Sequence, residues 1–334
     1  MAKSYLVTGG AGFIGAVFVK RLLREGNTVR VLDNYSRASS TRLADIQHEC
    51  EITAGDIRNP STVMECVKGV DCVCHLAAIN GTENFYTKPN EVLDVGVRGI
   101  LNVIEACLKQ GVKELMVAST SEVYQTPSFI PTDEKVPLTI PDPFNPRYSY
   151  AASKMISEII AINCGREYFD RVIIFRPHNV YGPDMGWEHV IPQFAVRLKK
   201  LAENVAGTVR FPVLGSGRET RAFVFIEDFI EGLMLLAKHG KKGVEIYNIG
   251  TTEEVAIEQL ANRAGKFFGK KIVIVPGKTP EGSTLRRCPD ISKISALGYK
   301  PKYLLEKGLP LTLSWYEEHM SEAPGVLTGS RGSR

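Results

Sequence analysis

The sequence lacks a strong charge of either sign. Its 41 lysines and arginines stand against 37 aspartates and glutamates, which gives a formal net charge of +4 over 334 residues. Two of the positive charges, Arg331 and Arg334, lie in the last four residues, so the rest of the chain carries about +2. Because the positive and negative charges nearly balance, the composition gives no basis for binding nucleic acid or a membrane surface. A local basic pocket for a diphosphate remains compatible with it.

Long hydrophobic runs and metal-binding motifs are also missing. The chain has no apolar run of about 18 residues, and after Met1–Ser4 it enters a short apolar run without the features of a signal segment. These absences predict a cytoplasmic protein with no membrane partner. The seven cysteines are scattered and form no CxxC pair, so we expect small buried thiols. The six histidines show no ligand spacing with them, and we predict no metal.

Short β-type runs alternate with helical stretches from the N-terminus onward. The expected strands are Tyr5–Thr8, Thr28–Leu32, Ile52–Ala54, Cys72–Leu76, Leu115–Ala118 and Val172–Phe175. The expected helices among them are Phe13–Arg24, Ser61–Lys68, Asn90–Gln110 and Tyr150–Tyr168. Strand and helix at this rhythm predict an α/β fold with a doubly wound parallel sheet.

The second half of the chain has a less regular alternation of strands and helices, with prolines and glycines that mark loops. The expected elements here are the helix Phe194–Ala202, a strand Ala222–Ile226 that leads into a helix ending near Gly240, the strand Ile246–Ile249, the helix Ala256–Phe268 and the strand Ile272–Val275. We predict a smaller α/β lobe that interleaves with the first domain. The expected division is a dinucleotide-binding domain at 1–176 with 221–250, a substrate lobe at 177–220 with 251–321, and a flexible tail at 322–334.

A glycine-rich turn follows the first expected strand. Gly9, Gly12 and Gly15 fit GxxGxxG, and Gly10 with the last two fits GxGxxG. Because the turn opens a helix, its glycines allow close approach of the backbone, and the helix N-terminus offers free N–H groups to a diphosphate. A plain glycine-rich turn is the alternative, and its position after a strand argues against it.

Acidic residues follow the next two strands. Asp33 ends the second strand about 18 residues after Gly15, where a carboxylate accepts hydrogen bonds from a ribose and repels a 2′-phosphate. This favours NAD over NADP, although Arg37 nearby could meet a phosphate. Asp56-Ile57 follows the third strand and would lie beside the adenine, with a turn aspartate as the alternative.

Tyr150-Ala-Ala-Ser-Lys154 is a YxxxK motif at the start of an expected helix, where this spacing puts both side chains on one face. A free tyrosine has a pKa of about 10 and is a poor base at neutral pH. We expect the lysine and a positive nicotinamide ring to favour the phenolate. Tyr150 can then exchange a proton with a substrate hydroxyl. A surface Tyr–Lys pair is the alternative.

A cluster of hydroxyls, Ser119, Thr120 and Ser121, ends the strand Leu115–Ala118 and is followed by Glu122. Ligands bind at the carboxyl edge of a parallel sheet. A hydroxyl here can therefore hydrogen-bond the reacting oxygen. Glu122 is a candidate base, a carboxylate that orients the substrate, or an N-cap of the next turn.

Further motifs accompany these. The full set is Thr8–Gly15, Asp33, Asp56-Ile57, His75–Ala78, Ser119–Tyr124, Tyr150 with Lys154, Arg176–Pro183, Arg221, Pro289–Ser292 and Leu297–Tyr299. This set resembles the extended short-chain dehydrogenase/reductases that act on nucleotide-sugars, from Tyr5 to about Tyr316. They include UDP-galactose 4-epimerases, sugar 4,6-dehydratases and UDP-glucuronate decarboxylases. The resemblance implies a Rossmann-like fold, NAD as cofactor, a nucleotide-sugar substrate, and a homodimer built on the helices at 90–110 and 150–165.

The resemblance also assigns roles to residues. Ala77 and Ala78 would line the nicotinamide side, Thr120 would bond the sugar C4 oxygen, and Asn179 and Arg221 would hold the diphosphate. The expected cofactor-binding residues are Gly9, Gly12, Phe13, Ile14, Gly15, Asp33, Asn34, Asp56, Ile57, Ala77, Ala78, Ser119 and Lys154. The expected substrate-binding residues are Asn80, Thr120, Tyr150, Asn179, Val190, Arg221 and Arg287. The expected catalytic residues are Tyr150, Lys154, Thr120 and Glu122.

The chain departs from the family pattern at three places. Gly96 stands where many relatives have Asn, and His178 replaces a usual aromatic. The usual Arg before a Pro-Gly turn is missing from 278–282, and Arg286 or Arg287 is the candidate replacement. These departures bear on sugar and base preference.

The family divides after a shared first step, the oxidation of the sugar at C4. A 4-epimerase returns the hydride to the other face, a dehydratase expels the C6 hydroxyl, and a decarboxylase loses a C6 carboxylate. We predict an NAD-dependent 4-epimerase, an isomerase rather than a lyase. Thr120-Ser121-Glu122 keeps the dehydratase and the decarboxylase open as alternatives. A non-catalytic NAD-binding regulator is a different class, and the presence of Tyr150 with Lys154 argues against it.

Overall fold

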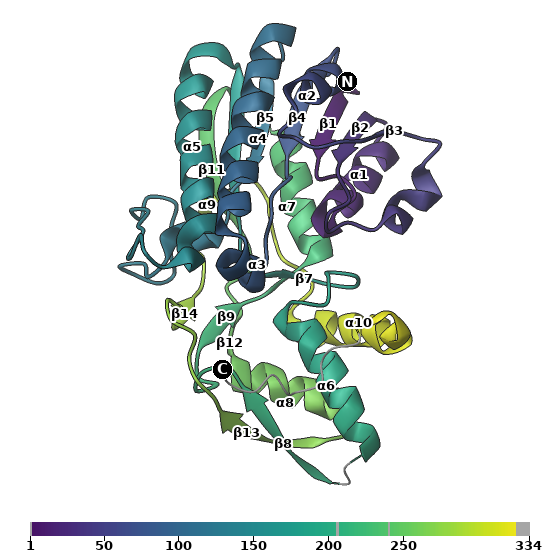
Figure 1. Cartoon of the computed structure of the whole chain (residues 1–334), viewed down its shortest axis with the longest axis vertical. Helices are drawn as coiled ribbons and strands as arrows, with labels where there is room; N and C mark the ends of the chain where they lie inside the picture. The colour runs from purple at the N-terminus through teal and green to yellow at the C-terminus, as the bar shows by residue number, and fades with distance from the viewer. Residues whose placement is uncertain (1, 205–206, 240, 325–334) are drawn as a thin grey trace.

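The main sheet has seven parallel strands in the order β11-β6-β5-β4-β1-β2-β3 (Figure 1). The computed structural model describes residues 2–204, 207–239 and 241–324. The strands are β1 (Ser4–Thr8), β2 (Thr28–Asp33), β3 (Glu51–Ala54), β4 (Cys72–His75), β5 (Glu114–Ala118), β6 (Arg171–Pro177) and β11 (Gly243–Ile249). The prediction of a doubly wound parallel α/β sheet is confirmed.

Helices cover both faces of this sheet. One face packs against α1 (Phe13–Arg24) and α7 (Ile226–Lys238), and the other against α2 (Pro60–Val67), α4 (Pro89–Gln110) and α5 (Ser149–Tyr168). Buried side chains alternate between the two faces along each strand, since a β-strand has a side-chain period of two. Along β1, for example, Val7 belongs to the first core and Leu6 to the second.

A smaller lobe lies below the carboxyl edge of the sheet in Figure 1. Its strands are β8 (Thr208–Val213), which pairs with β13 (Lys271–Pro276), and β9 (Thr220–Ala222), which lies between β12 (Glu254–Ala256) and β14 (Arg286–Arg287). Its helices are α6 (Val190–Asn204), α8 (Ile257–Phe267) and α10 (Leu305–Glu318). The strand β7 (Val180–Tyr181) pairs with β10 (Val224–Phe225). The lobe therefore takes segments from both sides of α7 and β11, and the boundaries predicted from sequence stay a proposal.

Shorter elements connect these parts. They are η1 (Ser40–Ile46), α3 (Thr82–Thr87), η2 (Ser121–Tyr124), η3 (Pro146–Tyr148), α9 (Ser292–Ser295) and η4 (Met320–Glu322). The predicted flexible tail, 322–334, lies outside the described residues from 325 onward. Among the described residues, no helix combines the length and apolar character needed to cross a membrane.

The expected strand Ala222–Ile226 is wrong as one element. Thr220–Ala222 and Val224–Phe225 are separate strands in different sheets, and Ile226 is the first residue of α7. A short apolar run does not distinguish a strand from the buried start of a helix. The acidic residues Glu227 and Asp228 mark the helix start, because carboxylates in the first turn complement the helix dipole.

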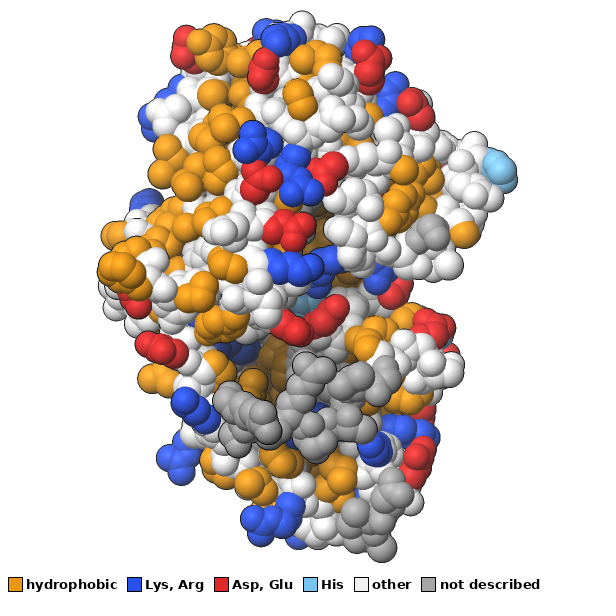
Figure 2. All heavy atoms as spheres, viewed as in Figure 1, with side chains coloured by type: hydrophobic (Ala, Val, Ile, Leu, Met, Phe, Trp, Pro, Cys, Tyr) orange, Lys and Arg blue, Asp and Glu red, His pale blue; other side chains and the backbone are white. Residues whose placement is uncertain are grey.

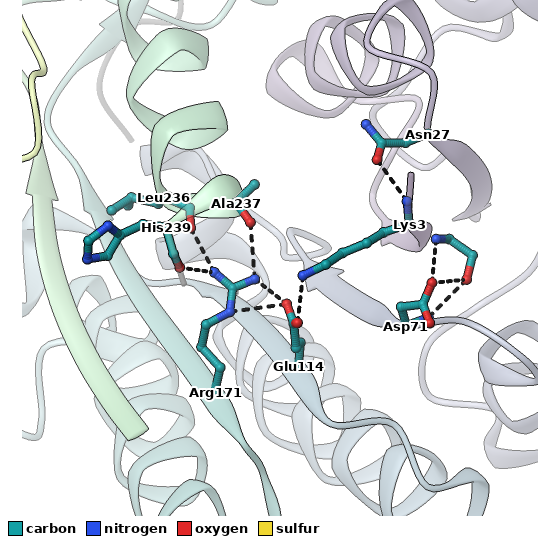
Figure 3. A network of polar contacts seen from close by, with 9 residues as sticks. Lys3, Asn27, Asp71, Glu114, Arg171, Leu236, Ala237 and His239 are labelled. Atoms are coloured by element: carbon teal, nitrogen blue, oxygen red, sulfur yellow. Dashed lines mark hydrogen bonds and ion pairs between the residues drawn. The ribbon is translucent and has the colours of Figure 1, made fainter. Parts of the chain in front are cut away.

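A buried arginine joins the end of α7 to the amino ends of β5 and β6 (Figure 3). Arg171, at the start of β6, is 5% exposed and donates from Nη1 to the carbonyls of Leu236 and His239, both at 2.8 Å. Its Nε donates to Glu114 Oε2 at 3.1 Å, and Lys3 Nζ donates to Glu114 Oε1 at 2.6 Å. The guanidinium thus donates to carbonyls of the last turn and C-cap of α7, where the helix leaves acceptor capacity unused.

We expect Glu114→Gln to lower the free energy of unfolding by about 3 kcal/mol, because it leaves the buried Arg171 charge unpaired. Urea unfolding followed by circular dichroism measures this. Glu105→Gln is the matched control, since Glu105 pairs with Lys109 on the exposed side of α4 and should change the value by less than about 0.5 kcal/mol. Equal effects of the two substitutions would contradict this role for Arg171.

Candidate active site

A cleft of about 990 Å³ follows the carboxyl edge of the sheet and reaches the smaller lobe. Every residue predicted to bind the cofactor lines it, as do the four predicted catalytic residues. Asn80, Asn179 and Arg287 line it as well, whereas Val190 and Arg221 do not. Figure 2 shows acidic and basic side chains close together down the middle of this face, toward the gap between the sheet and the lobe. The parallel sheet has therefore brought together motifs that lie far apart in the sequence.

The glycine-rich turn fits the diphosphate of a dinucleotide. Gly9 has a φ of +71°, and a Cβ there would lie 2.8 Å from the backbone nitrogen of Ala77 on the next strand end. A Cβ on Gly15 would collide with the carbonyl oxygen of Gly9. Gly12 is the N-cap of α1, and no side chain caps this helix end. The N–H groups of the first turn therefore remain available to an anion.

The acidic residues at the ends of β2 and β3 differ in their contacts. Asp33 is buried and accepts hydrogen bonds from the backbone N–H of Ala11 at 3.0 Å and of Tyr35 at 2.9 Å. It therefore fixes the glycine-rich turn and still has lone pairs for a ribose. Asp56 binds Arg58 and Asn34, and its hydrogen bond from Arg58 lowers its pKa to about 2. These contacts favour a structural role for Asp56, in which its carboxylate anchors the loop after β3.

Tyr150 and Lys154 lie on the buried face of α5. The Tyr150 ring stacks on Phe85 of α3, with 5.0 Å between ring centroids. Lys154 Nζ donates to the carbonyl of Ala118 at 2.7 Å and lies 6.0 Å from the centroid of the Tyr150 ring. Lys154 is thus held below the phenol by the end of β5, and two of its N–H groups remain free of that bond for a cofactor hydroxyl.

The protein alone does not favour the phenolate that the sequence predicts. Burial and, to a smaller extent, the charge of Glu122 raise the pKa of Tyr150 to about 12, although a hydrogen bond with Thr120 acts in the opposite direction. Burial lowers the pKa of Lys154 to about 8, while the Glu158 carboxylate raises it. The phenol is therefore protonated at neutral pH until further positive charge lies close to it.

Glu122 and Arg287 line the cleft where it reaches the smaller lobe, and Arg147 and Arg221 lie behind this part of its wall. Arg287 Nη1 donates to Glu122 Oε1 at 2.8 Å. Burial raises the pKa of Glu122, but the charges of Arg287, Arg147 and Arg221 outweigh it, so the pKa lies below its usual range. Glu122 is therefore ionised at neutral pH. The Nε atoms of Arg287 and Arg147 are buried and have no hydrogen-bond partner in the described residues.

The remaining predicted residues lie around this centre. The Asn179 side chain donates to the carbonyl of Ala222 at 3.0 Å. The Arg221 guanidinium is held by the carbonyls of Thr220 and Thr284, both at 2.7 Å, outside the cleft wall. Of the two candidate replacements, Arg287 lines the cleft, whereas Arg286 is exposed and pairs with Glu254.

Two departures from the family pattern have structural reasons. A Cβ on Gly96 would lie 2.6 Å from Cβ and Oγ of Ser153, so Gly96 lets α4 approach α5 closely, one residue before Lys154. His178 is buried and contacts Asn248 Oδ1 through Nε2 at 3.1 Å, and burial lowers its pKa to about 3. His178 is therefore a neutral core residue.

Sequence reasoning missed three contributors to the site, namely Phe85, Arg147 and Glu158. Phe85 and Arg147 carry no sequence pattern that links them to Tyr150. Glu158 does, because it lies four residues after Lys154 on the same face of α5. Within the described residues, no group of three His, Cys, Asp or Glu side chains could hold a metal ion.

Known proteins that are similar to this chain include an epimerase, a dehydratase and a decarboxylase. The NAD-dependent epimerase/dehydratase family matches residues 5–250. A UDP-N-acetyl-alpha-D-glucosaminuronate decarboxylase of Bacillus cytotoxicus is 32% identical over 95% of this chain and 99% of its own. A putative UDP-glucose 4-epimerase of Methanocaldococcus jannaschii is 29% identical over 94% of this chain and 98% of its own.

Solved structures agree over a similar length. The dTDP-glucose 4,6-dehydratase of Streptomyces venezuelae, with NAD bound, has a TM-score of 0.84 and 31% identity to this chain, and the match covers 96% of this chain and 98% of that one. The similarity thus extends over nearly the whole chain and includes proteins named for three different reactions.

We expect Asp33→Ser to reduce the preference for NAD over NADP by about tenfold or more, because the carboxylate that repels a 2′-phosphate is gone. Affinity for NAD should also fall, since Ala11 and Tyr35 lose their acceptor. Isothermal titration with both dinucleotides measures these effects. Asp45→Asn is the control, because Asp45 is exposed and pairs with Lys20. An unchanged ratio in Asp33→Ser would exclude this role.

Proposed function

This chain belongs to the NAD-dependent epimerase/dehydratase family, and from this premise we propose that it decarboxylates a nucleotide-linked uronic acid after transient oxidation at C4 of the sugar. The sequence alone favours a 4-epimerase. The observation that supports the decarboxylase is the ion pair of Glu122 and Arg287, which lies in the same cleft as Tyr150 and has a buried guanidinium Nε without a partner among the described residues.

The residues of the cleft fit NAD. The turn at Gly9–Gly15 would hold the diphosphate, Asp33 a ribose, and Lys154 the second ribose. NAD, when bound, supplies a hydride acceptor for the sugar C4 and a positive ring charge that favours the Tyr150 phenolate. Lys154 adds a second positive charge below the phenol.

Tyr150 and Thr120 would act on the sugar C4 oxygen. The phenol takes the proton of the C4 hydroxyl as that carbon is oxidised, and the Thr120 hydroxyl hydrogen-bonds the same oxygen. Both side chains are buried at the end of β5 and the start of α5. Burial excludes water from the proton transfer and strengthens each hydrogen bond.

Arg287 would hold the C6 carboxylate of a uronic acid. A guanidinium meets a carboxylate with two parallel hydrogen bonds, and Arg287 is 7% exposed, so the pairing would occur in a desolvated place. Once C4 is a ketone, the carboxylate is β to it. The C5–C6 bond can then break: carbon dioxide leaves, the electron pair of that bond moves through C5 to the C4 oxygen, and C5 takes a proton from solvent. The hydride removed from C4 would afterwards return to C4, so that the oxidation is transient. Glu122 next to this carboxylate would destabilise its negative charge and favour its loss.

The 4-epimerase is the second candidate. It is favoured because Glu122 and Arg287 are already paired with each other. Glu122 neutralises the charge of Arg287, so that a neutral hexose needs to supply no charged group. The same pair disfavours a dehydratase. A carboxylate whose pKa is lowered by three arginines is a weak base for a C5 proton.

We also propose that the active form is a homodimer that pairs α4 and α5 of two copies. Leu101, Leu108, Ile156 and Ile159 of these helices are exposed. Figure 2 shows hydrophobic side chains gathered along the edge where α5 lies in Figure 1. An apolar stripe of this kind on two long neighbouring helices is typical of a self-complementary interface.

Product analysis in heavy water tests the proposed reaction. We expect a nucleotide-linked uronic acid to lose carbon dioxide and gain one deuterium at C5, measured by mass and proton spectra of the products. Nucleotide-linked neutral hexoses should remain unchanged. An isomer of unchanged carbon content from a hexose would establish the epimerase instead, and loss of water the dehydratase. Tyr150→Phe is the control that should bind NAD and give no product.

We expect Arg287→Lys to lower kcat/KM for the uronic acid by about 100-fold, because an ammonium does not reproduce two parallel hydrogen bonds to a carboxylate. Steady-state kinetics measure the loss. Arg286→Lys is the matched control, since Arg286 is the exposed neighbour that pairs with Glu254, and its kinetics should stay close to those of the wild type. A wild-type kcat/KM in Arg287→Lys would remove Arg287 from carboxylate binding.

A further inference from the structure

A buried acid lies one helical turn after Lys154. Glu158 follows Lys154 by one turn of α5 and is 1% exposed. Its carboxylate accepts hydrogen bonds from Arg176 Nε at 2.8 Å and Nη2 at 2.6 Å, and from the hydroxyl of Ser119. A fully buried carboxylate needs such partners to keep its charge. The helix α5, the strand β6 and the residue that follows β5 thus meet at this one side chain.

Arg176 is fixed by a second set of contacts. Its Nη1 donates to the hydroxyl of Tyr124 at 2.7 Å, and the guanidinium lies 4.8 Å from the centroid of the Tyr124 ring. The Tyr124 hydroxyl donates to Asn248 Oδ1 at 2.8 Å. Arg176 therefore has few alternative positions, and it stays paired with Glu158.

The surroundings of Lys154 contain few other charges. On its own helix it faces Tyr150 and Glu158, β5 offers only the carbonyl of Ala118, and β4 contributes His75. Burial and, to a smaller extent, the charge of Lys154 lower the pKa of His75 to about 3, so the imidazole is neutral. Burial disfavours the ammonium, and Glu158 is the carboxylate that opposes this effect.

We propose that Glu158 is a positioning residue, whose carboxylate keeps Lys154 in its charged form beside Tyr150, with Arg176 holding that carboxylate in place. The need for a charged lysine during turnover rests on the proposed function. The effect of Glu158 on the charge of Lys154 does not, because it is a property of the protein alone. If the pair of Glu158 and Arg176 only joined α5 to β6, its removal would leave the titration of Lys154 unchanged.

The titration of Lys154 can be measured without a substrate. Protein labelled with ¹³C at lysine Cε gives one signal per lysine, and the signal missing in Lys154→Arg identifies Lys154. We expect a wild-type midpoint near the pKa of about 8. In Glu158→Gln it should fall by about one pH unit, because the carboxylate that favours the ammonium is gone. A wild-type midpoint in Glu158→Gln would overturn the proposal.

Two further variants make the result specific. Tyr124→Phe breaks the bond from Arg176 to the tyrosine but keeps the Glu158 charge, so its midpoint should equal that of the wild type. An equal fall in Tyr124→Phe would overturn the proposal in favour of a general loosening of the network. If the unpaired Arg176 prevents Glu158→Gln from folding, Glu158→Gln with Arg176→Gln replaces both charges by amides. The midpoint should still lie below that of the wild type, because Glu158 is the charge that raises the pKa of Lys154. The fall should be smaller than in Glu158→Gln, since the positive charge of Arg176 is lost as well, and its absence would overturn the proposal.

The pH dependence of turnover gives an independent readout. If charged Lys154 is required, activity falls as pH rises through its pKa, and in Glu158→Gln this fall should begin about one pH unit lower. The midpoint of the Lys154 signal could fall in Glu158→Gln while the decrease in activity at high pH stays where it is in the wild type. This result would overturn the claim that turnover needs a charged Lys154. If wild-type protein converts no nucleotide-sugar, the proposed function fails, and the titration of Lys154 still decides the role of Glu158.

Discussion

The ion pair of Glu158 and Arg176 is the interaction on which the geometry of the cleft depends. Its atoms lie 2.6 Å apart, with side-chain exposures of 1% and 2%. Breaking a pair of this kind leaves an uncompensated buried charge, which typically costs several kcal/mol. The pair therefore fixes the rotation of α5 against β6, and this rotation places Tyr150 and Lys154 at the end of β5. Tyr124 belongs to η2, which also contains Glu122, so the same network reaches the substrate end.

Local motifs were the part of the site that the sequence could predict. The turn at Gly9–Gly15, Asp33 at the end of β2 and the spacing of Tyr150 and Lys154 each depend on a few consecutive residues in one element. Their physical requirements are local, since a positive φ, a strand end and a helix face are set by neighbouring residues. The parallel sheet then places them along one edge. All of them line the cleft.

Contacts between distant segments and charge states could not be predicted in this way. Glu122 and Arg287 are 165 residues apart, and nothing in either segment specifies the other. The balance of charge at Tyr150 also depends on burial, which the sequence does not give. Lys154 was expected to favour the phenolate, but desolvation and Glu122 act against it. The expected strand Ala222–Ile226 failed for a related reason, because its apolar run fits a strand end and a helix start equally well.

Under the proposed function, different residues of the cleft act on different parts of the sugar, and this explains how one fold can support several reactions. In this proposal Tyr150 and Thr120 act on the C4 oxygen and Lys154 supports Tyr150, and this first step would be shared by an epimerase, a dehydratase and a decarboxylase. The proposed function therefore assigns the outcome to groups near C5 and C6. We infer that in this chain those groups are the Glu122 carboxylate and the buried guanidinium of Arg287, which has hydrogen-bonding capacity left over. A neutral hexose would leave that capacity unused in a desolvated place, which costs free energy. A uronic acid would use it, and the same guanidinium would then hold the leaving carboxylate β to the C4 ketone.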